Sequence, residues 1–85
     1  MSNNKDIKTI ELPNKAKVVI KKHPSDLPRV QLFKENGDQL TQPVAFPRFR
    51  KNIYQKLCSM DITRQEVVKA LGTIDTITNE MVLRK

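Results

Sequence analysis

The side chains suited to acid–base, nucleophilic or metal chemistry are scarce in this sequence of 85 residues. The single histidine, His23, and the single cysteine, Cys58, are too few to form a protein-only zinc site. We expect His23 to be a solvated loop residue, since Pro24 follows it, and Cys58 to lie in a core or at its margin. The two glycines are far apart and form no phosphate-binding loop. The sequence therefore predicts no catalytic residue, no metal site and no cofactor, and hence a protein that is not an enzyme.

Positive charge is the more informative feature. Sixteen lysines and arginines against nine acidic residues give a net charge of +7. Residues 1–58 hold twelve basic and five acidic side chains, whereas residues 59–85 hold four of each, so the whole excess lies in the first two thirds. An uneven basic field of this kind is typical of proteins that bind nucleic acid, an anionic membrane or an acidic protein. A lysine-rich surface that contacts only solvent is the alternative.

Length and composition exclude several classes of protein. No apolar run reaches the roughly 18 residues of a membrane span, and the polar opening does not resemble a signal peptide. We therefore expect a cytoplasmic protein, with the nucleoid or nucleus as alternative locations. A lone cysteine cannot form an internal disulfide. The length suits one small domain, so we predict a disordered tail over residues 1–6 and a single basic domain over residues 7–85.

The first half of the sequence has the pattern of an antiparallel sheet. Apolar and polar residues alternate over residues 7–12, 16–23 and 29–34, with turn signals between them. Asn36-Gly37 predicts a two-residue turn in which both residues have positive φ. This turn should lead into a short strand over residues 39–42, which Pro43 ends.

The second half has helical spacing. Apolar residues from Phe46 to Met60 predict an amphipathic helix with Pro47 in its first turn. Thr63 and Glu66 form a capping-box pattern that starts a second helix, and Gly72 is placed to end it. Residues 73–85 fit either a further helix or an edge strand.

These elements predict the α+β class, with a small antiparallel sheet of three or four strands packed on two helices. The predicted core follows from the alternation and the helical spacing, and consists of Ile10, Leu12, Val18, Ile20, Val30, Leu32, Phe49, Ile53, Leu57, Val67 and Leu71. A core this small favours a homodimer.

Two clusters of cations are the candidate binding residues. On the sheet face opposite the core, we expect Lys17, Lys21, Arg29 and Phe33, which we call the sheet patch. On the first helix, we expect Arg48, Arg50, Lys51 and Lys56, which we call the helix patch. An outward phenylalanine among cations suits stacking on a base while the cations bind phosphates. A homodimer contact is the alternative reason for an outward Phe33.

Two resemblances to known families support nucleic-acid binding. The segments Val30-Gln31-Leu32-Phe33, Glu35-Asn36-Gly37-Asp38 and Ile53-Tyr54-Gln55-Lys56-Leu57 resemble the last hairpin and helix of the positive-cofactor-four-like coactivators, which implies binding of single-stranded DNA. Glu66-Val67-Val68-Lys69-Ala70-Leu71-Gly72 and Thr76-Ile77-Thr78-Asn79 resemble the helix-turn-helix family. The second resemblance implies a duplex-DNA-binding regulator built from residues 63–84, with Thr76, Thr78 and Asn79 facing the DNA.

We therefore predict a non-catalytic protein that binds nucleic acid, single-stranded DNA or RNA before duplex, through the sheet and helix patches. The alternative from another class is a small phage-type or mobile-element protein that docks on an acidic surface of a host protein and inhibits or regulates it. Binding of the basic helix to anionic lipid is less favoured, because the apolar face of that helix must cover the sheet, and we expect no membrane partner.

Overall fold

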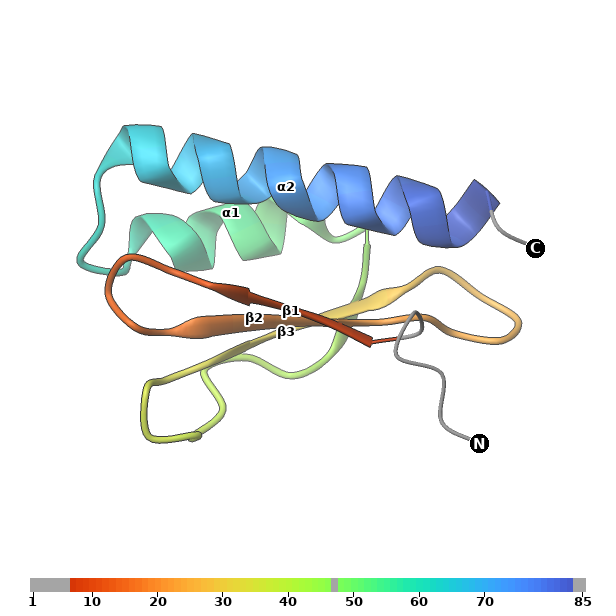
Figure 1. Cartoon of the computed structure of the whole chain (residues 1–85), viewed down its shortest axis with the longest axis horizontal. Helices are drawn as coiled ribbons and strands as arrows, with labels where there is room; N and C mark the ends of the chain where they lie inside the picture. The colour runs from red at the N-terminus through yellow and green to blue at the C-terminus, as the bar shows by residue number, and fades with distance from the viewer. Residues whose placement is uncertain (1–6, 47, 84–85) are drawn as a thin grey trace.

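The sheet of this protein forms one layer, and both helices lie on the same face of it (Figure 1). The computed structural model describes residues 7–46 and 48–83. The elements in chain order are β1 (Ile7–Glu11), β2 (Lys17–Lys21), β3 (Arg29–Phe33), β4 (Val44–Ala45), α1 (Arg50–Cys58) and α2 (Arg64–Leu83). This arrangement confirms the predicted α+β class. The predicted tail and the predicted helical position of Pro47 lie outside the described residues.

The four strands form an antiparallel sheet in the order β1-β2-β3-β4. Val18 of β2 lies between Ile10 of β1 and Leu32 of β3, so the apolar members of each alternation meet on one face. Val18 and Leu32 are fully buried beneath the helices. The period of two in the sequence therefore fixes which face of the sheet packs on the helices.

Two tight turns of the sheet, one between β1 and β2 and one directly after β3, have the same geometry. The N–H of Lys15 donates to the carbonyl of Leu12 over 2.9 Å, and the N–H of Leu12 donates to Ala16 over 2.8 Å. In the turn between Lys34 and Asp38, Gly37 donates to Lys34 over 2.9 Å and Lys34 donates to Asp38 over 2.8 Å. Each is a three-residue loop that ends in one residue with positive φ, Lys15 at 70° and Gly37 at 95°.

The predicted two-residue turn at Asn36-Gly37 is therefore wrong, because only Gly37 has positive φ. The side chain of Asn36 instead accepts from the N–H of Asp38 over 3.0 Å and donates to the Asp38 carboxylate over 3.1 Å. These side-chain bonds favour the observed three-residue loop over the predicted two-residue turn.

The predicted strand over residues 39–42 is also wrong. Gln39 makes only an isolated bridge to Phe33, and pairing with β3 resumes after Pro43, at β4. Between these points the hydroxyl of Thr41, and not a backbone carbonyl, accepts from the N–H of Leu32 over 3.1 Å. A side chain has replaced one rung of the ladder, so the chain leaves the sheet plane before it reaches Pro43.

The first helix begins later than predicted. Its first residue is Arg50. Phe46 lies in the preceding turn, where its N–H donates to the carbonyl of Pro28 over 3.0 Å. Phe46 is fully buried, whereas Phe49 is 43% exposed at the N-cap position. The predicted core position of Phe49 is wrong, because the chain enters the helix through a turn that directs Phe46 inward instead.

The second helix begins as predicted and continues past its predicted end. The N–H of Glu66 donates to the Thr63 hydroxyl over 3.2 Å, and the N–H of Thr63 donates to the Glu66 carboxylate over 2.9 Å, which confirms the capping box. The helix then runs through Gly72 to Leu83. The predicted end at Gly72 is wrong, because Ile74 and Met81, both buried, extend the apolar face that covers the sheet.

Candidate nucleic-acid interface

The residues of the sheet patch alternate along β2 and β3 with residues that are buried under the helices, so they belong to the other face of the sheet. Both helices lie on one face only (Figure 1). The strand register places Lys17 directly opposite Phe33 and Lys21 directly opposite Arg29. Val19 and Gln31 form the pair between them. The structure thus brings all four predicted residues of the sheet patch together on two neighbouring strands.

Two carboxylates lie beside the sheet patch. Asp26 is 3.2 Å from the Arg29 guanidinium, which also donates to the carbonyl of Leu27 over 2.7 Å. The N–H of Leu27, with the Arg29 guanidinium, holds the pKa of the Asp26 carboxyl below its usual value. At the other end of the sheet patch, Glu11 of β1 is the cross-strand neighbour of Lys17. Within the described part of the chain, Lys17 and Lys21 are exposed and make no ion pair.

Phe33 is half-buried, although it is on the outer face. Gln31, two positions before it on the same face, is only 7% exposed, and its side-chain amide donates to the carbonyl of Thr41 over 3.1 Å. The segment that follows the Asn36-Gly37 turn therefore covers one margin of the outer face. Sequence reasoning missed this cover, since Thr41 is ten positions from Gln31 and no local pattern joins them.

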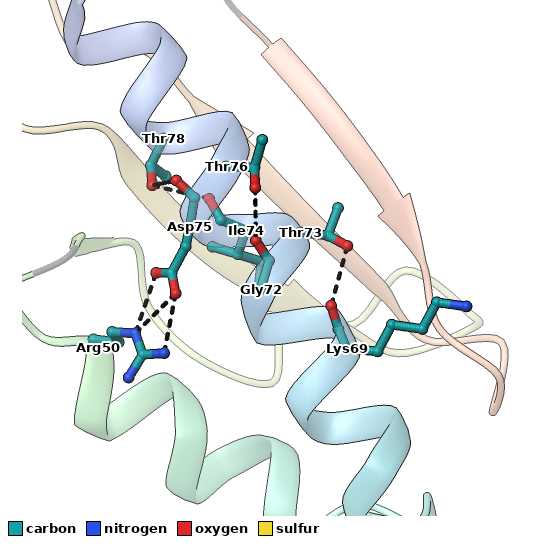
Figure 2. Close-up of polar contacts among 8 residues, drawn as sticks. All are labelled: Arg50, Lys69, Gly72, Thr73, Ile74, Asp75, Thr76 and Thr78. Carbon is teal, nitrogen blue, oxygen red and sulfur yellow. Dashed lines mark hydrogen bonds and ion pairs between the residues drawn. The ribbon is translucent and has the colours of Figure 1, made fainter.

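The helix patch is divided between different environments. Arg48 and Lys51 are exposed, whereas Lys56 is half-buried. Arg50 donates from Nε and from a terminal nitrogen to the carboxylate of Asp75 on α2, over 3.0–3.2 Å (Figure 2). This ion pair raises the pKa of Arg50 and neutralises its charge locally. The sequence gives no sign of this partner, which is 25 positions away.

The two patches do not form one surface. The α1 residues of the helix patch lie in the helix layer, and the sheet patch lies on the opposite face of the sheet (Figure 1). A ligand that contacts the outer face of the sheet cannot at the same time lie along α1 without passing around the domain. The sheet patch and the helix patch are therefore two separate candidate sites.

The helix-turn-helix prediction is wrong, because one continuous helix occupies residues 64–83. Two of its proposed DNA-facing residues are also bonded within α2 (Figure 2). The hydroxyl of Thr78, which is 2% exposed, donates to the carbonyl of Ile74 over 2.9 Å. The hydroxyl of Thr76 donates to the carbonyl of Gly72 over 3.0 Å.

Among the described residues, no three His, Cys, Asp or Glu side chains are grouped so that they could hold a metal ion. Cys58 is exposed, so its predicted place in a core or at its margin is wrong. The His23 ring accepts from the N–H of Ser25 over 3.2 Å. Neither described helix combines the length and the apolar character that a membrane crossing requires.

Comparison with known protein families, with curated proteins and with solved structures found no match.

Proposed function

We propose that the protein binds single-stranded nucleic acid on the outer face of its sheet, without catalysis. The observation that carries this proposal is the cross-strand pairing of Lys17 with Phe33 on the face of the sheet that the helices do not cover. Directly opposite residues in an antiparallel pair have Cβ atoms about 4.5–5.5 Å apart. A base stacked on Phe33 would therefore have its phosphate within reach of the Lys17 ammonium.

The second cross-strand pair extends this site along the strands. Lys21 and Arg29 lie four residues from the first pair on each strand, which is roughly 13 Å at the rise of a strand. A single strand that runs along β2 and β3 would therefore contact the two pairs with different phosphates. Because Arg29 already binds Asp26, we assign Lys21 the larger share of the phosphate contact at this end.

The sheet patch is favoured over the helix patch for two reasons. Asp75 neutralises Arg50, so an ion pair already occupies one cation of the helix patch. A flat strand surface also leaves the bases of a single strand room to stack, whereas a duplex would hide them.

The test is a fluorescence-anisotropy titration of a labelled single-stranded oligonucleotide at a series of salt concentrations. We expect binding that weakens steeply with salt, because each phosphate contact releases condensed counterions. Lys17→Gln should lower the log–log salt slope by about 0.7, the value for one contact to a single strand. Phe33→Ala should weaken binding about fivefold to a hundredfold, the range for loss of one stacked base.

Lys51→Gln is the matched control, because it removes the same charge from α1, on the other side of the domain. Equal losses for Lys17→Gln and Lys51→Gln would show that net charge alone drives binding and would contradict the assigned face. Absence of binding even at low salt would exclude nucleic acid and favour an acidic protein partner, which a pull-down from nuclease-treated lysate would then identify.

A further inference from the structure

The edge of the sheet at β1 has backbone groups that point away from the rest of the sheet. The N–H and carbonyl of Leu12 both bond within the first hairpin, to Ala16 and Lys15. Hydrogen-bonding direction alternates along an antiparallel strand, so Ile10 and Lys8 also face β2. The N–H and carbonyl groups of Ile7, Thr9 and Glu11 therefore point outward along β1.

The opposite edge of the sheet, at β4, offers far fewer backbone groups to a further strand. Strand β4 has two residues, and Pro43 before it has no N–H to donate. Next to it, the N–H of Leu40 donates to the carbonyl of Leu32 over 2.8 Å, and the Thr41 hydroxyl accepts from the N–H of the same residue. Of the two edges in the described part of the chain, only β1 offers a row of backbone groups long enough to pair with another strand.

We propose that β1 pairs antiparallel with β1 of a second copy of this chain, with the two-fold axis at Thr9. This register pairs all five residues of each strand. It sets Ile7 opposite Glu11, Lys8 opposite Ile10, and Thr9 opposite its own copy, with no like charges face to face. Shifting the strands by one residue pair in one direction would place Lys8 opposite Lys8, which is unfavourable.

A second copy fits this edge better than a strand of another protein for a geometrical reason. A two-fold pairing uses the single open edge of each copy, so the assembly closes at two chains and forms no fibre. In this pairing the apolar stem of the partner's Lys8 covers Ile10. Ile7, which is 52% exposed, gains contact with the partner's Glu11. Five paired residues make a small interface, so we expect the dimer to dissociate on dilution.

The dimer has a consequence for the outer face. The axis runs perpendicular to the sheet, so both outer faces point the same way and the two sheet patches lie on one eight-stranded surface. The pairing itself does not depend on the proposed function, because it rests on the backbone of β1 alone.

The test is sedimentation velocity over a range of protein concentrations, without nucleic acid and at a salt concentration that screens repulsion between the basic copies. We expect conversion from monomer to dimer as concentration rises. T9K and T9E should each weaken the dimer about fivefold or more, because each places like charges opposite one another at the axis. An equimolar mixture of T9K and T9E should restore it as a heterodimer.

Thr73→Lys is the matched control, since Thr73 is exposed on α2, and this variant should dimerise as the wild type does. A wild type that is monomeric at every concentration, a dimer that T9K leaves intact, a mixture that stays monomeric, or oligomers larger than two would each overturn the proposal. Hydrogen exchange of the wild type gives an independent reading. The Thr9 amide should exchange more slowly in the dimer than in the monomer, and equal rates would overturn the pairing even if the variants failed to fold.

Discussion

At the scale of single residues, two turns of the same geometry contain different residues at the same strained position. Gly37 adopts a φ of 95° without steric cost, whereas Lys15 holds a φ of 70° against the clash between its Cβ and the backbone. Lys15 is exposed, and its 3.8 Å approach to Glu35 joins two exposed side chains, so that ion pair contributes little. The two turns therefore have the same backbone conformation, once with a side chain at the residue of positive φ and once without.

We expect Gly37→Ala to lower the free energy of unfolding by about 1 kcal/mol, because alanine cannot adopt positive φ freely. A Cβ at Gly37 would meet no atom within 4 Å, so the backbone alone causes the loss. Lys15→Gly should raise the free energy of unfolding by up to about 1 kcal/mol, as relief of strain exceeds the entropy cost of glycine. Urea denaturation measures both, with Lys15→Ala as the control that removes the ion pair only. A stabilising Gly37→Ala would contradict the turn geometry.

At the scale of elements, α2 is longer than its local signals indicate. Glycine is typical of helix ends, yet Gly72 lies within a helix of 20 residues and is exposed. Burial of Val67, Leu71, Ile74 and Met81 along one face continues the helix across this weak point. Tertiary packing therefore overrides the preference of a single residue.

The length of α2 predicts the effect of Gly72→Ala. A Cβ at this position would meet no atom within 4 Å. In the interior of a helix, alanine is more favourable than glycine by about 1 kcal/mol. We expect the free energy of unfolding to rise by about that amount in urea denaturation. Gly37→Ala, the same substitution with the opposite expected sign, is the control. Destabilisation by Gly72→Ala would mean that the helix ends there after all.

At the scale of the whole molecule, the two layers decide which phenylalanine is inside. Phe46 and Phe49 both fit the helical spacing that predicted a buried face, but only Phe46 lies between the sheet and the helices. The hydrogen bond from the N–H of Phe46 to Pro28 fixes the entry of the chain into the helical layer. Phe49 is left partly in solvent as a result.

This difference gives a direct test of the packing. Phe46→Ala should lower the free energy of unfolding by about 3–5 kcal/mol, the range for emptying a buried aromatic site. Phe49→Ala should change it by less than about 1 kcal/mol, since much of that ring is already in solvent. Thermal and urea denaturation followed by circular dichroism measure both, and Phe46→Leu gives a milder variant if Phe46→Ala does not fold. Similar losses at the two positions would contradict the assigned interior.

The features that depend on neighbouring residues could be predicted from the sequence: the three long strands and their inward faces, the Thr63 capping box and the position of the excess positive charge. These follow from the period of two in a strand and from bonds between residues three positions apart. Three features could not be predicted in this way: the burial of Phe46, the neutralisation of Arg50 by Asp75, and the position of the sheet patch and the helix patch on opposite sides of the sheet. Each of these depends on contacts between residues distant in the chain, whose geometry exists only once the helices have packed on the sheet.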